Sequence, residues 1–127
     1  MNPPLVVIES PYAGRGWWPL SALRRWRNVA YVRACMRDSF LRGEYPIASH
    51  ALYTQPGVLR DAHSLERQLG IEAGLAWAAH AERGVFYIDF GESCGMRQAL
   101  HRHEKEGRPV DWRQLGGWWW RLLEGLG

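Results

Sequence analysis

Short apolar runs rich in β-branched residues alternate with helical patterns along this chain of 127 residues. The runs that predict strands lie at 4–9, within 45–53, at 85–90 and within 108–115. Parallel neighbours in a sheet need a long crossover between them, and a helix usually supplies it. The alternation therefore predicts a three-layer α/β fold, with a parallel sheet of four or five strands and helices on both faces.

The intervening segments predict the helices that cover this sheet. We expect them at about 28–42, 64–83 and 96–106, with a short one in 115–127. Asn28 is a good N-cap for the first helix, which leaves a long loop at 10–27. The 127 residues form one domain on this interpretation. The tryptophan-rich stretch 115–127 is a candidate contact between subunits, because tryptophan is enriched in interfaces.

Composition bounds the class of protein. Apolar residues make up 46% and charged residues 23% of the chain, which is typical of a soluble domain. We expect no membrane segment and no secretion signal, and therefore a cytoplasmic protein. The two cysteines form neither a disulfide scaffold nor a metal motif. A net charge of +3 gives no strong signal for nucleic acid, although fifteen of the sixteen basic residues are arginine.

The stretch 87–100, YIDFGESCGMRQAL, predicts the end of a buried strand, a turn of small residues and the start of a helix. The first amide groups of a helix are unpaired and attract anions. In parallel sheets, ligands bind outside the carboxyl ends of the strands. The candidate ligand contacts that lie near this edge are Glu9, Pro11, Tyr12, His50, Thr54, Asp89, Ser93, Gly95, Met96 and Arg97.

Several of these residues have a structural alternative. Glu9 can contact a sugar hydroxyl or pair with one of the arginines, and Tyr12 can stack on a base or fill the edge of the core. His50 can act as a general acid or bond to the backbone. Ser93 can simply cap the helix that follows. No metal or cofactor is expected, since His101 and His103 point apart on a helix and no phosphate loop is present.

Five stretches of the sequence resemble one enzyme superfamily. They are VVIESPYAG, NVAYVRACMRD, PIASHALYTQPG, ERQLGIEAG and DFGESCGM, followed by GRPV. Together they resemble the nucleoside 2-deoxyribosyltransferase superfamily and its small phage-encoded relatives, over roughly residues 5–115. The resemblance implies a flavodoxin-like or Rossmann-like fold, a homo-oligomer, and cleavage of an N-glycosidic bond by a glutamate nucleophile. Here Gly95 and Met96 match the family pattern, but Arg97 stands near the place of that glutamate.

Three functions follow as hypotheses. The first is a protein that binds a nucleotide or nucleoside derivative and sequesters a nucleotide immune signal, of the ADP-ribose or cyclic type, with Arg97 on a phosphate. The second is an enzyme that cleaves or transfers an N-glycosidic bond, with Glu9, Glu72 or Glu92 in place of the missing glutamate. The third is an interaction module that uses its tryptophans to bind another protein.

Overall fold

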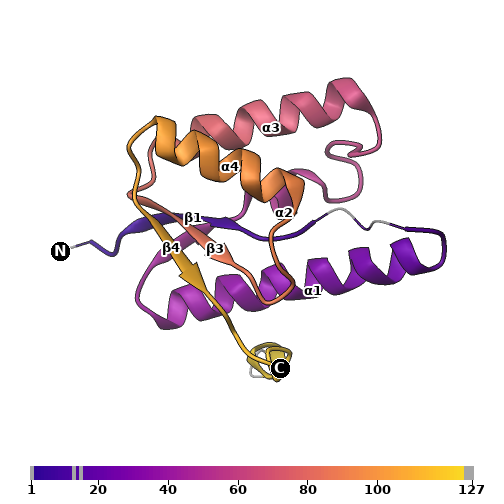
Figure 1. Ribbon diagram of the computed structural model, residues 1–127, viewed down its shortest axis with the longest axis horizontal. Coiled ribbons are helices and arrows are strands. Elements are labelled where there is room, and N and C mark those ends of the chain that lie inside the picture. The colour runs from indigo at the N-terminus through magenta and orange to yellow at the C-terminus, as the bar shows by residue number, and fades with distance from the viewer. Residues whose placement is uncertain (1, 13, 15, 125–127) are drawn as a thin grey trace.

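The computed structural model describes residues 2–12, 14 and 16–124. Its sheet contains four strands, all parallel, in the order β2-β1-β3-β4 (Figure 1). The strands are β1 (Leu5–Glu9), β2 (Tyr45–Ile47), β3 (Arg83–Tyr87) and β4 (Val110–Arg113). The parallel α/β architecture predicted from the alternating pattern is therefore confirmed, with four strands.

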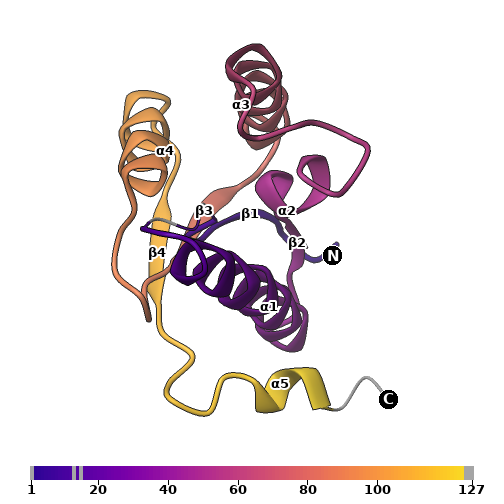
Figure 2. The same ribbon diagram turned by 90° about the vertical axis from the view of Figure 1, so that its right-hand side faces the viewer.

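Helices cover both faces of this sheet, which gives the three layers (Figure 2). One face carries α1 and, beyond it, α5, while α2, α3 and α4 lie over the other. These helices are α1 (Leu20–Leu41), α2 (Ser49–Tyr53), α3 (Ser64–Ala78), α4 (Cys94–Lys105) and α5 (Arg121–Glu124). Within the described ranges, no helix combines the length and the apolar character needed to cross a membrane.

The hydrophobic core lies between the sheet and α1. Successive strand side chains point to opposite faces, so Val6 and Ile8 of β1 share one face with Val85 and Tyr87 of β3. All four are fully buried, and they belong to the same cluster as Tyr31, Val32 and Cys35 of α1. Each fully buried aliphatic or aromatic side chain of this kind contributes about 1.5–3 kcal/mol to folding. The residues between them, Val7 and Glu9, face the opposite layer.

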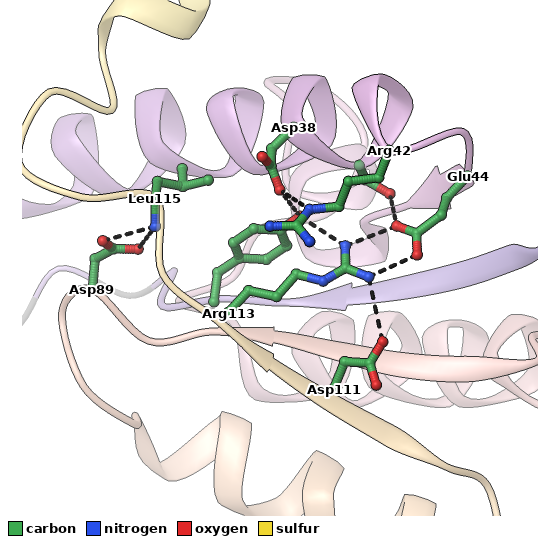
Figure 3. A network of polar contacts seen from close by, with 9 residues as sticks. Asp38, Arg42, Glu44, Asp89, Asp111, Arg113 and Leu115 are labelled. Atoms are coloured by element: carbon green, nitrogen blue, oxygen red, sulfur yellow. Dashed lines mark hydrogen bonds and ion pairs between the residues drawn. The ribbon is translucent and has the colours of Figure 1, made fainter.

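A buried polar network closes the α1 side of the sheet (Figure 3). Arg113 of β4 donates to both carboxylate oxygens of Glu44, at 2.8 and 2.7 Å, and also to the Tyr87 hydroxyl. The Tyr87 hydroxyl in turn donates to Asp38 of α1 at 2.7 Å. The bidentate bond raises the pKa of Arg113 and lowers that of Glu44, because each charge stabilises the other.

Helix α1 begins at Leu20, eight residues before the predicted start, so the prediction that Asn28 caps it is wrong. Asn28 instead lies buried in the middle of the helix, and its side-chain amide donates to the Tyr12 carbonyl oxygen at 3.1 Å. The residues from Leu20 to Arg25 are mostly good helix formers, and a helix therefore replaces the second half of the predicted loop 10–27.

The predicted strand within 45–53 ends after three residues, and Ser49–Tyr53 forms α2 instead. Helix α3 ends at Ala78 rather than near residue 83, because Arg83 already pairs with β1 as the first residue of β3. Within α3, Leu65 and Leu69 do not face the core. Their side chains are exposed, because another face of α3 turns toward the sheet.

Candidate functional site

A cavity of about 490 Å³ lies between α3 and α4, on the face of the sheet opposite α1. Figure 2 shows these two helices standing apart over that face. The walls come from both helices, the floor from β1, and one end from α2 and the loop after β1. Its volume lies within the roughly 300–1,000 Å³ that small-molecule sites occupy. The cavity reaches the carboxyl edge of the sheet, the edge where the sequence predicts a ligand site.

Glu9 ends β1 on the floor of this cavity. It points away from the α1 core because Val6 and Ile8 have the opposite parity along the strand. In the sheet it stands beside Phe86 of β3, which is fully buried. The side chain of Glu9 is 16% exposed. A carboxylate so placed is shielded by the protein yet open to a ligand.

Behind Glu9 lies His103 of α4, a buried side chain that the sequence did not single out as a site residue. Its Nδ1 is 2.8 Å from the Arg108 guanidinium, which can only donate hydrogen bonds. Nδ1 is therefore the acceptor, and the proton resides on Nε2. That Nε2 lies 3.8 Å from a carboxylate oxygen of Glu9. The pair Arg108–His103 thus presents an N–H group toward the carboxylate.

A second polar pair lies at the carboxyl edge. The Ser10 hydroxyl and Nε2 of His50 are 2.9 Å apart, and both residues line the cavity. Burial lowers the pKa of His50, and the nearby negative charge of Glu9 opposes that shift. His50 is thus neutral near pH 7. The Tyr12 ring meets the His50 ring edge-on at 6.0 Å, and Thr54 donates its hydroxyl hydrogen to the His50 carbonyl oxygen.

The start of α4 also lines the cavity, through Ser93, Gly95 and Met96. Ser93 caps this helix, as one of its two interpretations predicts, because its hydroxyl accepts from the Met96 amide at 3.2 Å. The Met96 sulfur accepts in return from the Ser93 amide at 3.4 Å. The Ser93 and Met96 amides are thus already hydrogen-bonded, although the sequence analysis treats the amides at this helix start as candidates for binding an anion.

The structure does not bring all the candidate residues together. Pro11 is buried and does not line the cavity. Asp89 lies on the α1 side, where its carboxylate accepts from the Leu115 amide (Figure 3). It also accepts from the Tyr31 hydroxyl and from the Gly116 amide. The parity of β3 explains this placement, because Asp89 follows Tyr87 by two residues and takes the same face. Asp89 therefore holds the segment after β4 in place through hydrogen bonds, and it does not line the cavity.

Arg97 is exposed and lies outside the cavity as well. The lining residues of α4 leave out Arg97, Leu100 and Glu104, which share the opposite face of the helix at a spacing of three and four. Glu72 lies away from the cavity for the same reason, and it accepts from Gln68 at 3.3 Å. Glu92 is exposed before α4 and is not part of the lining. Of the three candidate nucleophiles, Glu9 alone lines this cavity.

Sequence reasoning missed Ser10 and the end of α4, where Arg102, His103 and Lys105 line the cavity. Helical spacing could have identified His103. It lies four residues after Ala99 and seven after Met96, and these intervals place all three side chains on one face of the helix. Among the described residues, no group of three or more His, Cys, Asp and Glu side chains lies close enough together to hold a metal ion.

A solved structure of a 2-deoxyribosyltransferase from the psychrotolerant bacterium Bacillus psychrosaccharolyticus matches with a TM-score of 0.59 and 15% identity. The match covers 89% of this chain and 74% of that one, and it establishes a shared fold. No curated protein matches the sequence. The family model described as "Domain of unknown function (DUF7768)" matches residues 4–113, and the chain therefore belongs to that family.

Proposed function

We propose that this protein binds a nucleoside or a nucleotide in the cavity between α3 and α4, with the sugar against Glu9. The observation that carries the proposal is the Glu9 carboxylate, which stands at the carboxyl end of a parallel strand on the cavity floor. Its two oxygens can accept hydrogen bonds from sugar hydroxyl groups. The fold shared with a 2-deoxyribosyltransferase supports the same ligand class by analogy.

The neighbours of Glu9 suit the other parts of such a ligand. Tyr12 and His50 supply aromatic surface beside the carboxylate, against which a base can stack. The Ser10 hydroxyl adds a group that can both donate and accept. Binding alone would suffice to sequester a nucleotide signal. That role needs no chemical step from the protein.

A second candidate function is cleavage of the N-glycosidic bond, favoured because Glu9 is the candidate nucleophile that lines the cavity. The carboxylate would attack the anomeric carbon, and the base would leave with the electrons of the C–N bond and take up a proton from water. Water or a second base would then attack the same carbon and release the carboxylate. In this function the Nε2–H group of His103 faces the Glu9 carboxylate at 3.8 Å.

The test is incubation of the protein with a panel of nucleosides, nucleotides and cyclic nucleotides, followed by calorimetry. The mixture is then denatured and the released ligand is examined by chromatography. Intact ligand supports binding, and free base supports the glycosidic reaction.

Glu9→Gln should weaken binding at least about tenfold, because a hydrogen bond to a charged group is worth about 1.5–3 kcal/mol. Glu72→Gln is the matched control, since Glu72 is exposed on α3 and lies outside the cavity. The proposal fails if no member of the panel binds, or if the two variants bind equally well.

A further inference from the structure

The cavity continues past Glu9 along α4. This helix runs back from the carboxyl edge, because it connects β3 to the parallel strand β4. Its lining residues reach from Gly95 to Lys105, a difference of ten positions. At about 1.5 Å per residue this wall is roughly 15 Å long. A nucleoside held at Glu9 and Tyr12 fills the carboxyl-edge end and leaves the far end open.

The two walls of the far end differ in chemistry. The α3 wall is apolar there and presents Leu75 and Ala78. The opposite wall is cationic, since Arg102, Lys105 and Arg108 all line it. The far end is therefore suited to an anionic group that enters along an apolar surface.

The charges on this cationic wall are only partly compensated. Glu106 accepts from Arg102 at 2.6 Å and pairs with Arg108 as well, so one carboxylate serves two guanidinium groups. Within the described residues, the Lys105 side chain has neither a hydrogen bond nor an ion pair. Three positive charges thus face one negative charge, and the excess is available to a ligand.

The carboxylates that line the cavity lie elsewhere. Glu9 stands at the end of β1, while Asp61 and Glu66 lie near the start of α3 and pair with arginines. Arg67 near the start of α3 also lines the cavity, so both signs of charge are present there. The far end has cations but no lining carboxylate, and an anionic group is therefore attracted to it most strongly. The charge distribution along the cavity therefore sets the direction in which a charged ligand lies.

We propose, on the basis of the proposed function, that the ligand is a phosphorylated nucleotide whose phosphate lies against Arg102, Lys105 and Arg108. The sugar then contacts Glu9, and the chain of phosphates follows α4 toward its C-terminal end. The guanidinium forks match the geometry of phosphate oxygens, and the ammonium adds a compact charge. The phosphate site thus lies about two helical turns from Arg97, the residue that the sequence analysis proposes as the phosphate contact.

The experiment compares each nucleoside that binds with its 5′-monophosphate and 5′-diphosphate, and uses inorganic pyrophosphate alone as a further probe. The diphosphate should bind at least about tenfold more tightly than the nucleoside, a gain of about 1.4 kcal/mol. Lys105→Gln and Arg102→Gln should remove most of this gain and weaken pyrophosphate binding. Added salt should reduce it as well.

Arg97→Gln is the matched control, because it removes one charge from the same helix outside the cavity. Arg108 is left unchanged, because it also holds His103. Circular dichroism of each variant verifies that α4 stays folded. The inference is overturned if phosphorylation gives no gain, or if Lys105→Gln and Arg97→Gln have the same effect. If pyrophosphate binds through Lys105 while every nucleoside fails, the phosphate site stands and the proposed function falls.

Discussion

At the scale of single residues, Gly84 connects the fold to the candidate site. It lies in β3 beneath His103, and a Cβ atom added there would stand 2.6 Å from Nε2 of that ring. The absence of a side chain at Gly84 is what allows the imidazole to approach the sheet and reach toward Glu9. A strand glycine normally weakens a sheet, and here the close approach explains it.

We therefore expect Gly84→Ala to destabilise the protein by about 1–3 kcal/mol, the usual cost of overpacking a buried site. Urea denaturation gives the free energy of unfolding. Gly95→Ala is the control, because its added Cβ atom would meet only the Ser93 hydroxyl, at 3.9 Å. A Gly84→Ala protein as stable as the Gly95→Ala protein would contradict the role given to this close approach.

Residue identity alone left the orientation of several side chains open. The sequence places Asp89 and Arg97 at the correct edge of the sheet, yet both lie outside the cavity. Asp89 shares its face with Tyr87, and Arg97 shares its face with Leu100. Both relations are periodic and visible in the sequence. The sequence does not show which face lines the cavity, because the cavity forms only where α3 and α4 pack over the sheet. That arrangement is set by tertiary packing.

At the scale of elements, the strands were predictable and the short connections were not. The apolar runs that form β1 and β3 are buried on both sides, and such runs are read directly from composition. The helix α2 spans only five residues and forms next to α3, where Gly74 leaves space for Ser49. Helices this short depend on packing more than on intrinsic propensity, so local sequence does not reveal them.

The bidentate ion pair between Arg113 of β4 and Glu44 makes the stability of the protein depend on pH. The Arg113 guanidinium lowers the pKa of Glu44 in the folded state below the ordinary value of 4.5. The ionised Glu44 carboxylate therefore contributes its full stabilisation above pH 4.5. This stabilisation is lost as the pH falls through the lowered pKa of Glu44. We expect the free energy of unfolding to decrease in this acidic range.

Glu44→Gln should be less stable near neutral pH by about 3–5 kcal/mol, because it leaves the Arg113 charge buried without its partner. It should also lose less stability on acidification than the unmodified protein does. Urea denaturation near pH 7 and near pH 4 measures both effects, with the exposed Glu72→Gln as control. Equal acid dependence in all three proteins would remove Glu44 from this role.

At the scale of the whole molecule, the chain has more surface than its size requires. Its accessible surface is 8301 Å². A folded monomer of 14.6 kDa is expected to have roughly 6,900 Å², so the excess is about 1,400 Å². Much of the exposed apolar surface belongs to the start of α1 and to the residues before it. The exposed side chains there include Trp17 (89%), Trp18 (82%), Trp26 (73%) and Leu23 (63%).

The tryptophans after β4 divide into two groups. Trp119 meets Tyr31 and Phe90 edge-on and packs against the protomer's own core. Trp118 and Trp120 contact each other at 5.0 Å and remain exposed. The predicted subunit contact within 115–127 therefore rests on these two rings, while the third stabilises the single chain.

We predict that the protein is a homo-oligomer in solution, because the excess surface exceeds the roughly 800 Å² that one partner buries in a typical interface. Light scattering should give a mass at least twice that of the chain.

Leu23→Glu combined with Trp26→Glu should shift the protein toward the monomer, since charge at the centre of an apolar interface is costly. Arg33→Glu, exposed two turns further along α1, is the control and should leave the mass unchanged. Trp118→Ser with Trp120→Ser tests the second patch in the same measurement. A monomeric mass for the unmodified protein would contradict the prediction and leave these apolar side chains in water.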